Sequence, residues 1–123
     1  MQWWSRGRTP DRVRRMLQHS DVVVAVVEPD SGVLQAFCRA LSDGEFRAVV
    51  YDVIVHPDHQ GEGLGTQLLD ALCAHPLIGG VDRVELFCLP ELVPYYTRWG
   101  FAPVPPGWRT LTRPAPLAPP DGS

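Results

Sequence analysis

The stretch that decides the fold of this chain runs Tyr51-Asp-Val-Ile-Val-His-Pro-Asp-His-Gln-Gly-Glu-Gly-Leu-Gly-Thr66. Residues 51–55 are aromatic or β-branched except for Asp52, and this composition suits a buried strand. The next dipeptide, His56-Pro57, turns the chain, because proline fixes its own φ and disfavours helical backbone at the residue before it. Beyond three glycines, apolar residues recur at helical spacing at Leu64, Leu68, Ala71 and Leu72. The stretch therefore predicts a strand, a glycine-rich loop and a helix.

The glycine-rich loop predicts an anion-binding site. The first N–H groups of a helix have no partner within the helix, and the helix dipole adds partial positive charge there. With Gly61, Gly63 and Gly65 in the loop, no side chain at these positions keeps an anion from the backbone. The pattern indicates a phosphate or pyrophosphate ligand, and a tight connection that binds nothing is the structural alternative.

Two other glycine signatures fit this loop poorly. A P-loop requires lysine after Gly-x-x-x-x-Gly, and the chain contains no lysine. A dinucleotide fingerprint requires Gly-x-Gly-x-x-Gly, but Thr66 occupies the position of the third glycine. Neither signature explains the loop.

Length and composition limit the class of protein. The 123 residues predict a single domain, and the formal net charge of −3 argues against a nucleic-acid or membrane-surface protein. No apolar run could span a bilayer and the first residues lack the apolar core of a signal peptide, so we expect a cytoplasmic protein. The three cysteines have neither disulfide nor zinc spacing, which predicts buried reduced thiols and no metal site.

The first half of the chain predicts an antiparallel meander. Thr9-Pro10-Asp11 is typical of a helix start, with Thr9 as the N-cap. The continuous apolar run over residues 22–27 predicts a buried strand. Short turns connect it to a strand over residues 33–40 and then to the strand that ends at Val55. Strands joined by such turns pair antiparallel.

The second half predicts a parallel crossover, so that the fold class is α/β with a mixed α+β sheet. The helix after the glycines should end at Pro76, and a loop with Gly79-Gly80 leads to a strand over residues 84–88. A right-handed crossover would place that strand beside residues 51–55. We further expect a short helix over 92–99, strands over 101–104 and 109–112, and a disordered Pro/Ala-rich tail over 113–123 after a domain of residues 1–112.

Two motifs resemble one protein family. Gln60-Gly61-Glu62-Gly63-Leu64-Gly65 resembles the Gln/Arg-x-x-Gly-x-Gly/Ala signature of the GNAT superfamily of N-acetyltransferases. The run Tyr95-Tyr-Thr-Arg-Trp-Gly-Phe101 is similar to the aromatic-Tyr-x-x-x-Gly-Phe element near the end of the same domain. The resemblance implies a GNAT-like fold and transfer of an acetyl group from acetyl-CoA to a small amine or a peptide amine by direct attack on the thioester.

The same resemblance implies roles for individual residues. The pyrophosphate of acetyl-CoA would bind the backbone of Gln60, Gly61, Glu62, Gly63, Leu64, Gly65 and Thr66. The strand Val53-Ile54-Val55 would splay from its parallel neighbour, pair with the pantetheine arm and offer a backbone N–H to the oxyanion. Tyr96 would contact the cofactor and give a proton to the departing thiolate, since a phenol is neutral at pH 7.

The general base is open between two interpretations of Asp52. It is the one acid in an otherwise apolar strand, where burial would raise the pKa of an unpaired carboxylate and suit it to a base. In the other interpretation Asp52 orients a loop or forms an ion pair with an arginine such as Arg39, and a water relay serves instead as the route for the proton of the amine.

The start of the chain departs from the family pattern. Family members usually have a strand and a helix before the helix expected at Pro10, so we expect the first edge strand to be missing and a second copy to cover that edge in a homodimer. The segments that line the acceptor side in similar proteins here contain Trp3, Trp4, Phe37, Arg39 and Asp43. The short start also leaves a non-catalytic acetyl-CoA-binding module as the alternative to an enzyme.

Overall fold

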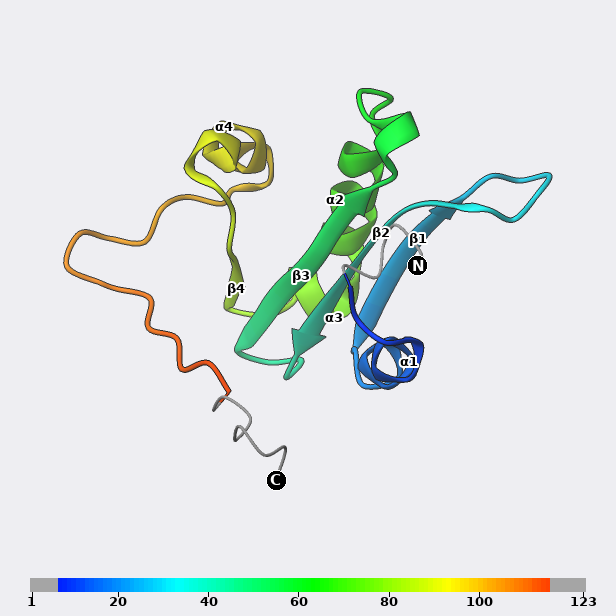
Figure 1. Ribbon diagram of the computed structural model, residues 1–123. Helices are drawn as coiled ribbons and strands as arrows, with labels where there is room; N and C mark the ends of the chain where they lie inside the picture. Colours follow the sequence, from blue (N-terminus) through cyan, green and yellow to red (C-terminus); the bar gives the residue numbers. More distant parts are fainter. Residues whose placement is uncertain (1–6, 116–123) are drawn as a thin grey trace.

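A computed structural model describes residues 7–115 of the chain. It contains a four-stranded mixed sheet in the order β1-β2-β3-β4 (Figure 1). The first three strands pair antiparallel and β4 lies parallel to β3, which confirms the meander and the parallel crossover. The strands are β1 (Val22–Val27), β2 (Leu34–Ser42), β3 (Arg47–Val55) and β4 (Arg83–Leu86).

In the described residues, four α-helices and three 3-10 helices precede, connect or follow these strands. The helix α1 begins at Pro10, and the side chain of Thr9 accepts a hydrogen bond from the backbone N–H of Arg12, as the sequence predicted. The helix after the glycines ends before Pro76, also as predicted. The elements are α1 (Pro10–Gln18), η1 (Pro57–His59), α2 (Leu64–Ala74), α3 (Pro76–Gly79), η2 (Pro90–Leu92), α4 (Val93–Tyr96) and η3 (Thr97–Trp99).

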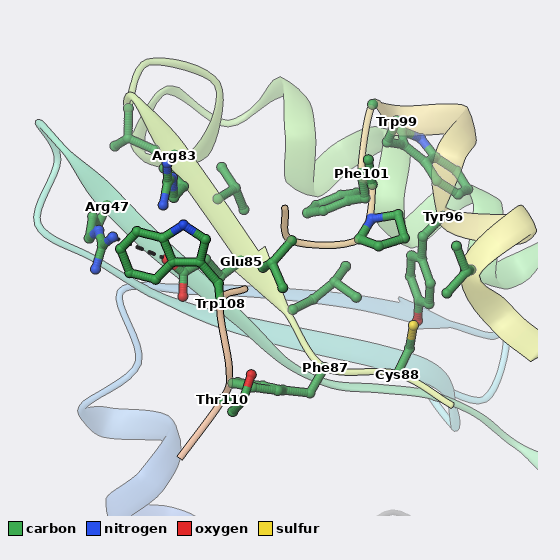
Figure 2. A pocket seen from close by; sticks show the side chains of 18 of the residues that line it. Arg47, Arg83, Glu85, Phe87, Cys88, Tyr96, Trp99, Phe101, Trp108 and Thr110 are labelled. Atoms are coloured by element: carbon green, nitrogen blue, oxygen red, sulfur yellow. Dashed lines mark ion pairs between the residues drawn. The ribbon is translucent and has the colours of Figure 1, made fainter. Parts of the chain in front are cut away.

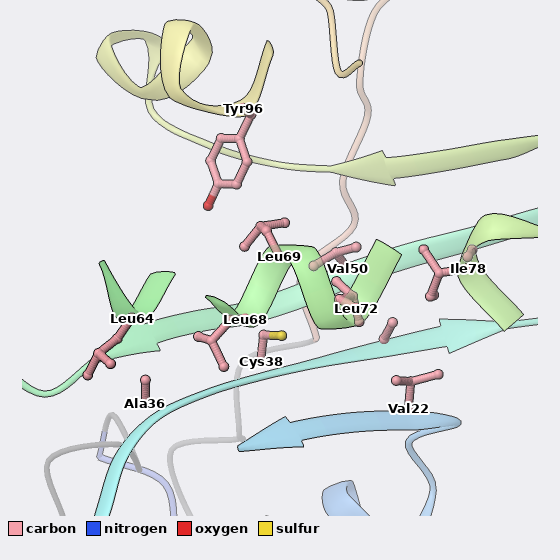
Figure 3. Packing of buried hydrophobic residues seen from close by; sticks show 12 residues of the cluster. Val22, Ala36, Cys38, Val50, Leu64, Leu68, Leu69, Leu72, Ile78 and Tyr96 are labelled. Atoms are coloured by element: carbon pink, nitrogen blue, oxygen red, sulfur yellow. The ribbon is translucent and has the colours of Figure 1, made fainter. Parts of the chain in front are cut away.

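The core lies between α2 and one face of the sheet. Leu68, Leu69 and Leu72 of α2 are fully buried, and Figure 3 shows them between the strands and Tyr96. Burying each leucine side chain stabilises the fold by about 1.5–3 kcal/mol. This packing fixes α2, and hence the glycine loop before it, against β3.

Two predictions about strands need correction: the burial of residues 22–27 and the pairing partner of β4. The run over residues 22–27 is not buried on both faces, because β1 is an edge strand that packs on α2 with one face only, and Val23 and Val27 are 45% and 49% exposed. The sequence does not distinguish a strand buried on both faces from an edge strand buried on one, because an apolar run fits both. The strand expected over 84–88 is β4, and it pairs with Arg47–Val50 instead of residues 51–55.

Three further predictions differ from the structure near the end of the chain. Residues 101–104 and 109–112 form no strand, and Pro103, Pro105 and Pro106 lack the N–H that a sheet ladder needs. The short helix expected over 92–99 is divided into α4 and η3, and the expected glycine loop before β4 begins as the single turn α3. Residues 113–115 have no regular structure, and the rest of the expected tail lies outside the described residues.

Within residues 7–115, no helix is long and apolar enough to cross a membrane.

Candidate active site

The strand β3 loses its parallel neighbour halfway along its length. Its pairing with β4 ends at Val50 opposite Leu86, whereas β3 itself continues to Val55. Figure 1 shows β3 and the segment that follows β4 diverging beyond this point, with α4 on the far side of the gap. The splay implied by the family resemblance is therefore present in the structure.

The backbone of β3 exposes particular groups to this gap. The N–H of His56 donates to the carbonyl oxygen of Gln35 in β2 (2.7 Å). Because successive N–H groups of a strand point to opposite sides, the N–H of Ile54 also faces β2, while those of Val53 and Val55 face the gap. These two amides are the candidate partners for an extended ligand, and Ile54 contributes packing on the other face of the strand.

A β-bulge stands at the start of the splayed half. Arg39 pairs with Tyr51 and Phe37 pairs with Ile54, so that Asp52 and Val53 together oppose one residue of β2. Asp52 has a φ of 57°, and it is the single non-glycine residue with positive φ in the described part of the chain. The bulge changes the side of the strand on which the following residues present their backbone.

Two arginines hold the carboxylate of Asp52. Arg39 Nε donates at 2.7 Å, and the guanidinium of Arg8 donates to both carboxylate oxygens at 3.2 and 3.3 Å. Burial acts to raise the pKa of Asp52, whose side chain is 5% exposed, but the hydrogen bonds from both arginines outweigh burial and lower the pKa below its usual value. A carboxylate stabilised in this way is a weak base, which favours the ion-pair interpretation. Arg8 was not anticipated, because nothing in its sequence context connects it to a residue 44 positions away.

The glycine loop has the conformation that an anion site requires. Gly61 and Gly63 both have a φ of 83°, which side chains disfavour, and open space surrounds the position of a Cβ at either residue. Gly63 is the N-cap of α2 and supplies no side-chain hydrogen bond to the helix. The first backbone hydrogen bond of α2 runs from Gln67 N–H to the Gly63 carbonyl, so the three N–H groups before it are left for a ligand.

The remaining loop residues act differently from one another. A Cβ at Gly65 would lie 2.7 Å from Tyr95 Oη, so here glycine permits close packing. Leu64 is buried in the core and offers only its backbone. Glu62 contacts His59 Nδ1 at 3.0 Å, while Gln60 is exposed and Thr66 is partly buried in the first turn of α2.

Tyr96 lies buried beneath the gap at the end of α4. It is 8% exposed, and Figure 2 shows its hydroxyl group directed toward Cys88. Burial above all, with smaller contributions from Cys88, Tyr95 and Cys38, raises the pKa of Tyr96. The phenol is thus neutral and can donate a proton. Edge-to-face contacts with the rings of Tyr95 (5.2 Å between centroids) and Phe101 (6.2 Å) fix its orientation.

A cavity of about 1270 Å³ adjoins Tyr96 on the outer side of β4. Residues 100–105 and 108–111 form its opposite wall, and Trp108, which is 74% exposed, projects along it (Figure 2). The cavity does not include the glycine loop. It meets the candidate site only at Cys88 and Tyr96, and Cys88 is exposed, contrary to the expectation of a buried thiol.

The three described residues among those expected on the acceptor side each make a contact within the fold. Arg39 stacks on the ring of Tyr51 (4.8 Å to the centroid), and Phe37 is buried. Asp43 Oδ1 accepts hydrogen bonds from the backbone N–H groups of residues 45–47, so it shapes the turn before β3. Trp3 and Trp4 lie outside the described residues.

Known proteins are similar to this chain in sequence and in fold. A family model described as "Acetyltransferase (GNAT) domain" matches residues 18–103. Serotonin N-acetyltransferase 2, chloroplastic, of Oryza sativa subsp. japonica is 41% identical over 85% of this chain and 53% of its own length. Uncharacterized N-acetyltransferase ycf52 of Porphyra purpurea is 33% identical over 78% of this chain and 56% of its own. A crystal structure of a putative GNAT acetyltransferase from Xanthomonas campestris pv. campestris superimposes with a TM-score of 0.78 at 31% identity, covering 92% of this chain and 77% of that one.

A mixed sheet that splays beside a glycine-led helix without a side-chain cap is the fold that this chain shares with these acetyltransferases. The chain belongs to the GNAT family of N-acetyltransferases. It spans about half the length of the two curated relatives described above.

Proposed function

We propose that this chain transfers an acetyl group from acetyl-CoA to a primary amine, which attacks the thioester directly. The observation that supports this most strongly is the juxtaposition of three features: the open backbone of Val53 and Val55, the uncapped start of α2, and a buried neutral phenol at Tyr96. An extended thioester with a pyrophosphate at its far end needs these three kinds of group.

Each feature has one task in the proposed reaction. The pyrophosphate binds the N–H groups of residues 60–66, where glycine keeps the approach open. The pantetheine arm pairs with the free edge of β3 as an additional strand would, and a backbone N–H in residues 53–55 stabilises the oxyanion. The leaving sulfur takes its proton from Tyr96 Oη.

The amine must lose a proton before it attacks, because alkyl amines are protonated near neutral pH. The two arginines on Asp52 lower its pKa and oppose a role as base. We therefore propose that water carries this proton to solvent. Asp52→Asn tests whether water or Asp52 takes this proton. If Asp52 were the catalytic base, the substitution would abolish the pH dependence of kcat/KM.

The names of two relatives point to two classes of acceptor amine. One relative is named for serotonin, and a second, Histone acetyltransferase TAP1 of Glycine max, is named for a protein substrate; it is 36% identical over 60% of this chain. A small aromatic amine and a peptide amine are therefore the two acceptor classes to compare. We propose no nucleic-acid or membrane partner. A homodimer and a cytoplasmic location remain predictions, and light scattering at micromolar concentration would test the former.

Calorimetry with acetyl-CoA and with free adenosine is the first experiment. Saturable binding of acetyl-CoA without binding of adenosine would show that the pyrophosphate and pantetheine provide the affinity. Turnover with serotonin or a peptide amine would then establish the enzyme. If a folded sample does not bind acetyl-CoA, the proposed function is wrong.

A non-catalytic acetyl-CoA-binding module is the second candidate. The sheet face opposite α2 favours it, because Val23, Val27 and Leu41 are more than one third exposed and so leave the acceptor side partly uncovered by described residues. Binding of acetyl-CoA without turnover on either acceptor class would support the module.

A further inference from the structure

The geometry points to Asp52 as a positioning residue: we propose that the Arg8–Asp52–Arg39 ion-pair cluster holds the β-bulge that turns the N–H groups of Val53 and Val55 toward the thioester. This proposal rests on the proposed transfer reaction and gives the carboxylate a role other than that of a base. Asp52 acts through the backbone that follows it and does not touch the reacting atoms.

The first support is the position of the bulge. The pairing of β3 with β4 ends at Val50, and the bulge falls at Asp52, two residues later. Without the extra residue, the alternating directions of the backbone N–H groups along β3 would be shifted by one residue from this point. The N–H groups of Val53 and Val55 would then face β2, and the open side would present those of Ile54 and His56. The bulge therefore decides which groups the splayed half offers to a ligand.

The second support is the backbone conformation of Asp52. A left-handed φ is unfavourable for any residue with a Cβ and persists where the surroundings hold it. Aspartate tolerates this region better than most residues, although glycine would adopt it without strain. Because every other positive φ in residues 7–115 belongs to glycine, the side chain at position 52 must contribute something that glycine could not.

The third support is that the cluster joins three separate segments. Arg39 comes from β2, Asp52 from the bulge of β3 and Arg8 from the residues before α1. The guanidinium of Arg39 also lies on the ring of Tyr51, which precedes the bulge. With its side chain 14% exposed, Arg39 is too enclosed for solvent to replace the carboxylate. The cluster therefore fixes the bulge from both sides.

Two substitutions at one position separate positioning from base catalysis. Asp52→Asn removes the charge but keeps a side chain that tolerates left-handed backbone and accepts a hydrogen bond from one arginine. Asp52→Ala removes both properties. We expect Asp52→Ala to lower kcat by about 100-fold, as loss of an oxyanion donor does, and Asp52→Asn, which keeps one of the hydrogen bonds and tolerates the backbone conformation, to lower kcat clearly less. If both variants lose activity equally, Asp52 is a base and the proposal is wrong.

Amide hydrogen exchange gives a readout that does not depend on turnover. In the wild type, acetyl-CoA should slow exchange at Val53 and Val55, and this protection should be lost in Asp52→Ala and kept in Asp52→Asn. Folded Asp52→Ala with normal protection and normal kcat would overturn the proposal. If the wild type itself shows neither protection nor transfer, the proposed function fails and not this inference alone.

Arg39→Gln and Arg8→Gln keep the test decisive if Asp52→Ala does not fold. Both leave the carboxylate in place and should raise its pKa, which would make a catalytic base more effective near neutral pH. Positioning predicts the opposite result, a fall in kcat that is larger for the more buried Arg39 than for the half-exposed Arg8. The exposed pair between Asp11 and Arg14 supplies the matched control, and Asp11→Asn should leave kcat unchanged. A rise in kcat in either arginine variant would overturn the proposal.

Discussion

The helices α1 and α2 begin in opposite ways. Thr9 caps α1 with its side chain, Pro10 has no N–H to satisfy, and Asp11 places a negative charge in the first turn. At α2 the N-cap is Gly63, no side chain caps the helix, and no acid stands in the first turn. The chain thus satisfies the start of α1 with its own groups and leaves the start of α2 open. A helix end without internal partners costs stability, so this difference supports the anion site proposed at the start of α2.

The largest expected effect comes from closing the open start with Gly63→Val. A β-branched residue at a φ of 83° is strained, and its side chain would occupy the approach to the N–H groups of α2. We expect affinity for acetyl-CoA to fall by more than about 100-fold, which is about 2.7 kcal/mol, in calorimetry. The control is Gly32→Val in the turn between β1 and β2, where φ is 72° and the space around the Cβ is equally open. If Gly32→Val weakens binding as much as Gly63→Val, general strain and not the anion site explains the loss.

Tyr96→Phe separates the chemical step from binding of acetyl-CoA. Loss of the proton donor should lower kcat by about 100-fold, the lower range for general acid catalysis, while affinity for acetyl-CoA changes little. Because burial raises the pKa of Tyr96, kcat should fall at alkaline pH only above the ordinary phenol value of about 10. Stopped-flow assays across pH would measure both. Tyr95→Phe is the neighbouring control, and equal kcat in Tyr96→Phe and wild type would remove the assignment.

Gly65→Ala tests whether the third glycine serves packing. Its new Cβ would meet Tyr95 Oη at 2.7 Å, so either Tyr95 or the start of α2 must move. We expect affinity for acetyl-CoA to fall by about tenfold, or 1.4 kcal/mol. In the double variant Gly65→Ala/Tyr95→Phe the hydroxyl is gone, and the next ring atom lies at an ordinary 3.7 Å. Binding that the second substitution does not restore would contradict the packing explanation.

The smallest effect is expected from Thr9→Ala, which removes the side-chain cap of α1. Removing this cap should lower the free energy of unfolding by about 1 kcal/mol in urea denaturation. Affinity for acetyl-CoA should not change. Thr9→Ser, which keeps the hydroxyl, is the control and should be close to wild type. A loss of acetyl-CoA affinity in Thr9→Ala would mean that α1 takes part in the cofactor site.

Local sequence patterns were sufficient to predict most of the helices and strands and the open glycine loop. The cap at Thr9, the strand that ends at Val55, the glycines and the helix that stops before Pro76 all follow from short-range preferences that neighbouring residues express directly. The family motifs depend on the same local patterns, and this is why the two of them sufficed to anticipate the splay and the position of Tyr96.

The register of β4, the exposure of β1 and the partners of Asp52 depend instead on tertiary packing. Each depends on residues far apart in the chain: Val50 meets Leu86, the residues described in the structure leave one face of β1 exposed, and Arg8 reaches a carboxylate in the third strand. A single acid in an apolar strand is equally consistent with a base and with an ion pair. Which of the two it becomes depends on the charges that folding places within hydrogen-bonding distance, because these set its pKa and fix its backbone.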